Sequence, residues 1–300
     1  MRESLFNRLS DPYTHIASES YVCIGSAADC QIPKEYGAVG SRWSRQPQFP
    51  ADTLALRLMP TLKQMQAARF RLPSALKECS RLDFLQLPLA MLTALEPGDL
   101  PRSLRKLMII NTEGPLPEGR IDWDLLGDTS INSLTLYDEA GSPDGKAALA
   151  GVETLLPRLR YLSFDQRRHG DLAPYACDLE VLLVSGGGNG EWLKDAPAGI
   201  RALALLGMGR EFDTALLRPF ANLEALLLNG IRSVIDADVL IDLDALRELQ
   251  VLNSRKWNRP DRIAELPLRS LMVLDCGRPF RGFRHLFDDA RYEKLDIDFS

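Results

Sequence analysis

LEVLLV (179–184), IRALAL (200–205), LEALLL (223–228) and LRELQV (246–251) are four copies of one pattern, apolar-x-x-Leu-x-apolar, that start 21 to 23 residues apart. Apolar and variable residues alternate in each copy, and a period of two places successive side chains on opposite faces of a β-strand. Each copy therefore predicts a short strand with one buried face. The roughly 15 residues between copies are enough to turn back and start the next strand beside the first.

The pattern extends over more than two thirds of the chain. Six further copies are LDFLQL (82–87), LRKLMI (104–109), INSLTL (131–136), LRYLSF (159–164), LRSLMV (268–273) and YEKLDI (292–297). All ten copies have Leu at the central position, and neighbouring copies start 20 to 28 residues apart. Stacked repeats share a continuous core that no single repeat forms alone. We expect short helices in return segments such as EWLKDA (191–196), DTALLRPF (213–220) and ADVLIDLDA (237–245).

Residues 82–297 resemble the leucine-rich-repeat family, whose repeats follow L-x-x-L-x-L-x-x-N/C-x-L. The resemblance implies an α/β solenoid: a curved parallel sheet of about ten strands, with short helices and turns on the convex side. The Asn/Cys position of the motif is occupied here by Thr112, Glu139, Arg167, Gly187, Met208, Ile231, Ser254 and Cys276. Only Cys276 matches, while Asn111, Asn229 and Asn253 lie one place early. We therefore expect irregular repeats of bacterial type.

Residues 1–49 do not fit the repeat, and we interpret them as an N-terminal cap. The solenoid is expected over 50–300, with TLALRL (53–58) as a degenerate first strand. The last copy ends three residues before Ser300, which leaves an exposed strand edge. Asp296 and Asp298 put charge on that edge, and such charge discourages strand addition. The protein is predicted to be a monomer, or a homodimer through this C-terminal edge.

Composition is that of an ordinary globular protein, with 45% hydrophobic and 26% charged residues. The net charge of −5, from 36 basic and 41 acidic residues, argues against nucleic acid as the main partner. No apolar run is long enough to span a membrane, and residues 1–15 lack the apolar core of a secretory signal. Five scattered cysteines without a Cys-x-x-Cys pair predict free thiols in a reducing cytoplasm.

Outward strand positions line the concave face in leucine-rich repeats and usually carry the ligand contacts. On neighbouring repeats these positions predict an apolar patch of Leu183, Leu206, Leu227, Leu252, Met272 and Leu274, with Asn229 among them. Tyr137 and Tyr161 are expected beside the patch, with Asp138 and Asp165 at its rim. Exposed apolar surface with aromatic anchors is typical of a protein-binding site. The alternative is that loops or the N-terminal segment cover these side chains.

The position two before each central Leu carries charge in most copies. Its occupants are Asp83, Arg105, Asn132, Arg160, Glu180, Arg201, Glu224, Arg247, Arg269 and Glu293. Because neighbouring strands bring these residues side by side, we expect opposite charges to pair laterally.

Two features resemble catalytic sites. The glycines of 186–190, within LEVLLVSGGGNGEWL (179–193), resemble the phosphate loop of a Rossmann-like enzyme. The acidic residue expected about 20 residues later is missing, so a structural turn is the better interpretation. Cys276 and His285 share one repeat and could form a nucleophile–base pair, but Cys276 occupies an inward position. No metal-binding motif occurs. The sequence predicts no enzymatic activity, no cofactor and no metal.

Arginine and aromatic residues interleave in RKWNRPDR (255–262) and RPFRGFR (278–284). Trp257, Arg278 and Arg281 are candidate contacts for a partner, because Trp and Arg are common at binding hot spots. An acidic protein surface fits this mixture. Stacked nucleic acid bases, or an ordinary solvated loop, are the alternatives.

Together these observations predict a non-catalytic protein-binding solenoid that acts as a stoichiometric inhibitor or adaptor. The excess of Arg over Lys is typical of a GC-rich bacterial genome. An immunity protein that neutralises a bacterial toxin or effector is the specific form we favour, by analogy. The alternatives are an enzyme that binds a nucleotide cofactor at 186–190, and a nucleic-acid binder using the arginine-rich C-terminal loops.

Overall fold

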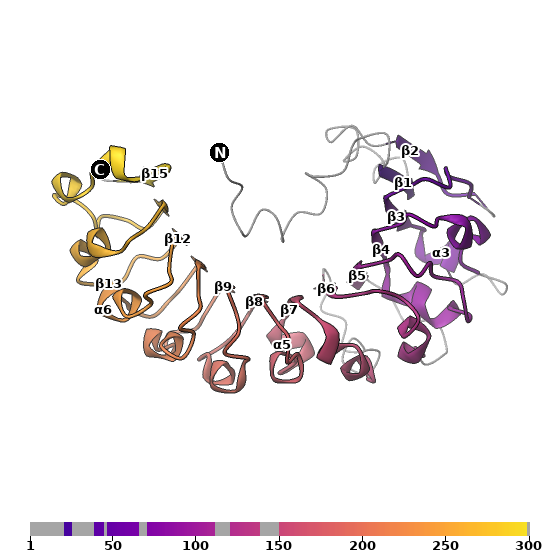
Figure 1. Cartoon of the computed structure of the whole chain (residues 1–300), viewed down its shortest axis with the longest axis horizontal. Coiled ribbons are helices and arrows are strands. Elements are labelled where there is room, and N and C mark those ends of the chain that lie inside the picture. The colour runs from indigo at the N-terminus through magenta and orange to yellow at the C-terminus, as the bar shows by residue number, and fades with distance from the viewer. Residues whose placement is uncertain are drawn as a thin grey trace. The chain divides into compact units, whose positions relative to one another are not determined.

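The computed structural model describes residues 21–25, 39–44, 47–65, 71–111, 121–138 and 150–298. The chain divides into two compact units, with the boundary between Leu159 and Arg160, and each unit is described by itself. We call them the N-terminal unit and the C-terminal unit. Within each unit the strands lie on one side and the short helices on the other (Figure 1). All ten copies of the repeat form a strand, which confirms the predicted solenoid.

The C-terminal unit contains seven parallel strands, which follow one another in chain order. They are β7 (Tyr161–Asp165), β8 (Val181–Ser185), β9 (Ala202–Leu206), β10 (Ala225–Asn229), β12 (Glu248–Leu252), β14 (Ser270–Leu274) and β15 (Lys294–Ile297). The central leucines align without slippage, as in Leu203 beside Leu226 and Leu226 beside Leu249. Those from Leu162 to Leu271 are 0% exposed, whereas Leu295 on the edge strand is half-buried.

The N-terminal unit contains β1 (Tyr21–Gly25), β2 (Val39–Arg42), β3 (Ala55–Met59), β4 (Phe84–Pro88), β5 (Lys106–Asn111) and β6 (Ser133–Asp138). They are parallel, in the order β6-β5-β4-β3-β1-β2, so β2 lies outside β1. β3 corresponds to the degenerate strand expected near residues 53–58, and Leu56 aligns with the central Leu85. β1 and β2 lie within the segment interpreted as a cap, and they extend the sheet.

The return segments form helices of one or two turns, most of them 3₁₀. In the N-terminal unit these are α3 (Leu62–Met65), η2 (Ser74–Glu78), η3 (Leu89–Ala94), η4 (Trp123–Leu126), η5 (Val152–Thr154) and η6 (Leu156–Arg158). In the C-terminal unit they are α5 (Gln166–His169), η7 (Ala173–Tyr175), η8 (Glu191–Asp195), η9 (Thr214–Leu217), α6 (Ala237–Ile241), η10 (Pro260–Glu265), η11 (Arg284–Leu286) and η12 (Asp289–Arg291). The helices predicted in 191–196, 213–220 and 237–245 are confirmed by η8, η9 and α6. A two-stranded ribbon of β11 (Ile235–Asp236) and β13 (Trp257–Asn258) accompanies them.

Several of these helices start at an aspartate that caps the first turn. The carboxylates of Asp122, Asp213, Asp236 and Asp288 each accept a hydrogen bond from the backbone N–H two residues later. Such a cap satisfies a donor that the first turn of a helix leaves free. The caps stabilise helices that are too short to be stable by themselves.

The chain turns away from five strands of the C-terminal unit through a residue in the left-handed region. The residues are Gly186, Gly207, Gly230, Asn253 and Asp275, with φ between 51° and 71°. The N–H groups of the first four donate to the last carbonyl of the next strand at 2.7–3.0 Å. Glycine, asparagine and aspartate tolerate this conformation best. The asparagine that lies one place before the motif position in this repeat, Asn253, therefore forms the corner.

The next position, which holds Asn or Cys in the family motif, points into the core. Its occupants Met208, Ile231, Ser254 and Cys276 are all buried. The Ser254 hydroxyl donates to the Leu252 carbonyl at 2.8 Å and accepts from the Ile231 N–H at 3.0 Å. The Cys276 thiol donates to the Leu274 carbonyl at 3.2 Å. At this position Ser254 and Cys276 therefore form hydrogen bonds with the backbone, whereas Met208 and Ile231 fill the core with apolar side chains.

Ion pairs link neighbouring rungs beside the strands, as the sequence predicted. Arg105 pairs with Asp83, Arg160 with Glu180, and Arg201 with Glu224. Arg269 instead pairs at 2.7 Å with Glu248, a buried residue of β12. β15, the strand of the last repeat, forms an edge of the sheet, and Asp296 and Asp298 are exposed on this edge.

Arginine side chains also bind the carbonyl ends of the return segments. In the N-terminal unit, the Arg158 guanidinium donates to the carbonyls of Leu126, Gly127 and Thr129 at 2.8–3.2 Å. In the C-terminal unit, Arg291 donates to the carbonyls of Ala264 and Leu266. Each arginine ties its own repeat to the preceding one. The repeat pattern contains no sign of these contacts.

Candidate functional site

The candidate site lies on the face of the C-terminal sheet that points away from the core, here called the open face. The first, third and fifth residues of each strand point to this face. Strand pairing aligns the third residues as Leu183, Ala204, Leu227, Gln250 and Met272. It aligns the fifth residues as Asp165, Ser185, Leu206, Asn229, Leu252 and Leu274.

The six predicted patch residues lie close together on this grid, and we call them the apolar strip. The apolar strip consists of Leu183, Leu206, Leu227, Leu252, Met272 and Leu274, and each of these side chains is half-buried. It crosses β8, β9, β10, β12 and β14. Asn229 lies between Leu206 and Leu252, and its side-chain oxygen accepts a hydrogen bond from the Asn253 amide at 3.1 Å.

On β7, β8, β10 and β12 the first residue is buried, whereas the third and fifth are half-buried. Tyr161, Val181, Ala202 and Ala225 form a buried cluster with Ala204, and Leu183 and Leu227 pack against it. The packing of these side chains against one another accounts for the burial of this first row. The side chains Leu206, Leu252, Met272 and Leu274 lie outside the cluster. These four are the strip residues that do not pack against the cluster.

The residues predicted around the patch lie in different surroundings. Tyr161 is only 6% exposed, so its ring belongs to the buried cluster and offers little surface to a partner. Asp165 accepts a hydrogen bond from the Ser185 hydroxyl at 3.1 Å. Tyr137 is 50% exposed on β6 of the N-terminal unit. The side chain of Asp138 lies outside the described part of the chain.

The glycine loop after β8 packs against the next rung. A Cβ atom at Gly187 would lie 2.7 Å from the Met208 sulfur, and one at Gly190 would lie 2.7 Å from the Phe212 ring. The Trp192 indole N–H donates to the Gly187 carbonyl at 3.2 Å. The absence of a Cβ atom at positions 187 and 190 therefore allows protein side chains to pack against the backbone of the loop. This geometry supports the structural turn over the phosphate loop.

The proposed nucleophile–base pair is not assembled. The Cys276 thiol is 2% exposed and donates to backbone carbonyls, whereas His285 is exposed and its Nδ1 lies 3.0 Å from the Gly282 carbonyl. Burial raises the pKa of the Cys276 thiol, which disfavours the reactive thiolate. Among the residues that the structure describes, no group of three or more His, Cys, Asp or Glu side chains is arranged to hold a metal.

Thiol labelling of the native protein checks this assignment. Near pH 8, iodoacetamide should modify exposed Cys177 and leave Cys79 and Cys276 unmodified until the protein is unfolded. Burial raises the pKa of Cys79 to about 11, so roughly one molecule in a thousand carries a Cys79 thiolate at that pH. Peptide mass spectrometry locates the labels, with a Cys177→Ser variant as the control. Rapid native labelling of Cys276 would contradict its assignment to the core.

In the arginine-rich loops, fewer arginine and aromatic side chains can contact a partner than the sequence indicates. The Trp257 ring meets Phe280 edge-on at 5.1 Å between centroids, and Phe280 is 0% exposed. Arg259 pairs with Asp238, Arg262 with Asp238 and Glu265, and Arg284 with Asp289. Arg278 and Arg281 are exposed. The aromatic rings thus support the loop structure, and base stacking on them is disfavoured.

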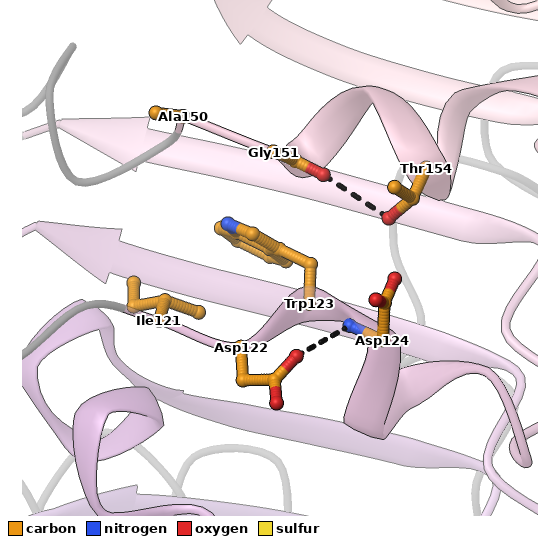
Figure 2. A pocket seen from close by; sticks show the side chains of 7 residues that line it. All are labelled: Ile121, Asp122, Trp123, Asp124, Ala150, Gly151 and Thr154. Atoms are coloured by element: carbon orange, nitrogen blue, oxygen red, sulfur yellow. Dashed lines mark hydrogen bonds between the residues drawn. The ribbon is translucent and has the colours of Figure 1, made fainter.

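A separate pocket of about 430 Å³ lies in the N-terminal unit beside η4. Figure 2 shows its lining residues, with the Asp122 carboxylate turned to the Asp124 N–H and the Thr154 hydroxyl turned to the Gly151 carbonyl. The Trp123 ring is 3% exposed and lies about 3.0 Å from where a Cβ atom at Gly151 would be. No motif in the sequence indicated this pocket. Trp123 serves mainly to fill the core of the unit.

The ordered parallel strands, aligned leucines and short return helices define a leucine-rich-repeat solenoid. A comparison with solved structures finds the crystal structure of an internalin from Listeria monocytogenes, at 15% sequence identity and a TM-score of 0.46. The match covers 88% of this chain and 82% of the internalin chain. No family model and no curated protein sequence matches the chain. None of the described helices has the length and apolar character needed to cross a bilayer.

Proposed function

We propose that this solenoid binds another protein through the apolar strip on its C-terminal unit. The observation that carries the proposal is that each of five neighbouring strands places at least one half-buried apolar side chain on this face. A contiguous apolar surface of this kind usually marks an interaction site. A sheet also holds such side chains at fixed spacing, so little order has to be gained when a partner binds.

The specific role that we propose is that of a stoichiometric inhibitor or adaptor. The Cys276–His285 pair is not assembled, and the glycine loop is packed with side chains. Occupying a partner is an effect that needs no chemistry from the solenoid. An immunity protein that covers a bacterial toxin is one form of this role, and it rests on analogy between folds.

The proposal is tested by affinity capture from native lysate of the source organism. Wild type is compared with a Leu206→Glu/Leu252→Glu variant, which places two carboxylates in the apolar strip at residues outside the buried cluster. The matched control is Val234→Glu, because Val234 is an apolar side chain that is 49% exposed and lies outside the strip. All three proteins are checked for folding by circular dichroism. We expect one stoichiometric protein to be retained by wild type and by the control, and lost by the double variant.

Charge in an apolar contact lacks its hydration shell and a partner, so binding should fall at least about 100-fold. Equal capture by all three proteins would show that the apolar strip does not bind the partner. The search would then turn to the other exposed surfaces.

A further inference from the structure

Basic side chains line the turns that follow four neighbouring strands of the C-terminal unit. The first lies four residues after β9, the second three residues after β10, and the others follow β12 and β14. We call them the basic ridge: Arg210, Arg232, Arg255, Lys256, Arg278 and Arg281. All six are exposed.

The turns are held side by side by the same register that aligns the strands. The Arg232 N–H donates to the Met208 carbonyl of the preceding turn at 3.2 Å. The Arg255 side chain lies over the following turn, 3.8 Å from where a Cβ atom at Gly277 would be. Neighbouring parallel strands are about 4.8 Å apart, so successive turns present their charges as a row. Arg210 and Arg232 join this row although they are isolated in the sequence.

The basic ridge differs from the other arginines of its unit because none of its side chains forms an ion pair or a hydrogen bond with the described residues. Arg167, Arg247 and Arg291 donate to backbone carbonyls. Arg160, Arg201, Arg218, Arg259, Arg262, Arg269 and Arg284 each form an ion pair. No ridge residue forms an ion pair with any residue in the described ranges. Glu211 and Asp275 are exposed carboxylates in the same turns, and the basic side chains outnumber them. A row of unpaired like charges creates a positive potential that attracts an anionic surface.

The position of the ridge connects it with the apolar strip. Leu206, Leu252 and Leu274 are the last residues of their strands, and the ridge begins three or four residues later. A partner that covers the strip therefore reaches the ridge. We infer that the basic ridge binds a row of carboxylates on the protein that occupies the apolar strip. This inference rests on the proposed function and specifies its partner as an acidic protein.

Nucleic acid fits these observations less well. Single-stranded nucleic acid binds where basic grooves carry aromatic rings for stacking, yet Phe280 is fully buried and Trp257 packs edge-on against it. The chain as a whole is acidic, with 41 acidic and 36 basic residues. A protein partner can contact the apolar strip with apolar side chains and the basic ridge with carboxylates, so it fits both surfaces.

Binding of fluorescent poly-L-glutamate tests the ridge directly, with a single-stranded oligodeoxynucleotide of similar charge as the second probe. The ridge variant is Arg232→Glu/Arg255→Glu/Arg278→Glu. The matched control is Lys63→Glu/Arg81→Glu/Arg102→Glu, which makes the same change in net charge at exposed residues of the N-terminal unit. Circular dichroism verifies that both variants are folded. Affinities are measured at low and raised salt.

We expect wild type to bind poly-L-glutamate more tightly than the oligonucleotide, with an affinity that falls as salt rises. The ridge variant should bind at least about tenfold more weakly, and the control should stay within about twofold of wild type. If both variants lost affinity for poly-L-glutamate equally, the binding would depend only on net charge, and the inference would be overturned. Tighter binding of the oligonucleotide would overturn it in favour of nucleic acid, and no binding of either probe to wild type would overturn it outright.

The Leu206→Glu/Leu252→Glu variant separates this result from the proposed function. That variant retains the ridge, so it should bind poly-L-glutamate nearly as well as wild type does, even though it loses the captured protein. If capture is unaffected by the leucine changes while poly-L-glutamate still depends on the ridge, the proposed function fails and the acidic preference stands. If poly-L-glutamate binding does not depend on the ridge while capture depends on the strip, the inference fails alone.

Discussion

Gly190→Ala is expected to destabilise the protein by about 3 kcal/mol or more, because two separate costs add at this position. The new Cβ atom would lie 2.7 Å from the ring of Phe212, which is 3% exposed and surrounded by core side chains. The ring must move, and its neighbours leave it little room. The backbone at Gly190 also has φ of 79°, which costs an alanine about 1 kcal/mol more than a glycine.

Gly188→Ala is the matched control in the same loop. Gly188 has φ of 58°, but a Cβ atom there would meet no other atom within 4 Å. The control therefore includes the backbone cost, about 1 kcal/mol, without the clash. Urea unfolding followed by circular dichroism measures both free energies. Similar losses in the two variants would show that the ring of Phe212 does not constrain position 190.

This comparison also distinguishes the two interpretations of the loop. A loop that cradles phosphate needs its glycines so that the protein backbone can approach the ligand, so substitutions would act mainly on ligand affinity. A loop packed between rungs needs glycine where side chains approach it, so substitutions act on stability. The contacts of Gly187 and Gly190 with Met208, Trp192 and Phe212 predict the second outcome.

The core of this fold was predictable because it depends on a local pattern. A central Leu with apolar neighbours at a period of two specifies which face of each strand is buried. The near-constant spacing then specifies that the strands are parallel neighbours. Leu182, Leu203 and Leu226 align in the structure as this reasoning requires. The lateral pairs such as Arg201 with Glu224 follow from the same alignment.

The open face was less predictable, because burial there depends on what packs above each side chain. The strand pattern assigns Tyr161 and Leu206 to the same face, yet the first is buried and the second is half-exposed. The N-terminal strands show the same limit. β1 joins the sheet beside β3 although its sequence, YVCIG, lacks the leucine pattern.

Charged side chains show why neighbours in the sequence are a poor guide to a binding surface. The sequence drew attention to 255–262 and 278–284 as compact basic clusters. In the structure Arg259, Arg262 and Arg284 are paired with acidic residues. Arg210 and Arg232 come from separate repeats and join Arg255 only through the register of the sheet. Arg158 also finds its partners, the carbonyls of Leu126, Gly127 and Thr129, about 30 residues away.

Leu226→Ala is expected to destabilise the protein by about 3–5 kcal/mol. Leu226 is 0% exposed and is aligned with Leu203 on one side and Leu249 on the other. Removing its side chain leaves a cavity that parallel strands on both sides prevent from closing. A loss of this size corresponds to a decrease of roughly 10 °C in Tm for a domain of this length.

Leu295→Ala makes the same chemical change at the edge of the same sheet and should cost about 1 kcal/mol. Leu295 is half-buried and has an aligned neighbour, Leu271, on one side. The space that it vacates is open to water, so the cavity term is small. Thermal and urea unfolding of the two variants measure the difference, and hydrogen exchange locates the strands that lose protection. In a solenoid each repeat is stabilised by its neighbours, so Leu226→Ala should expose β9 and β12 together with β10. Equal costs at the two positions would mean that the repeats do not share one continuous core.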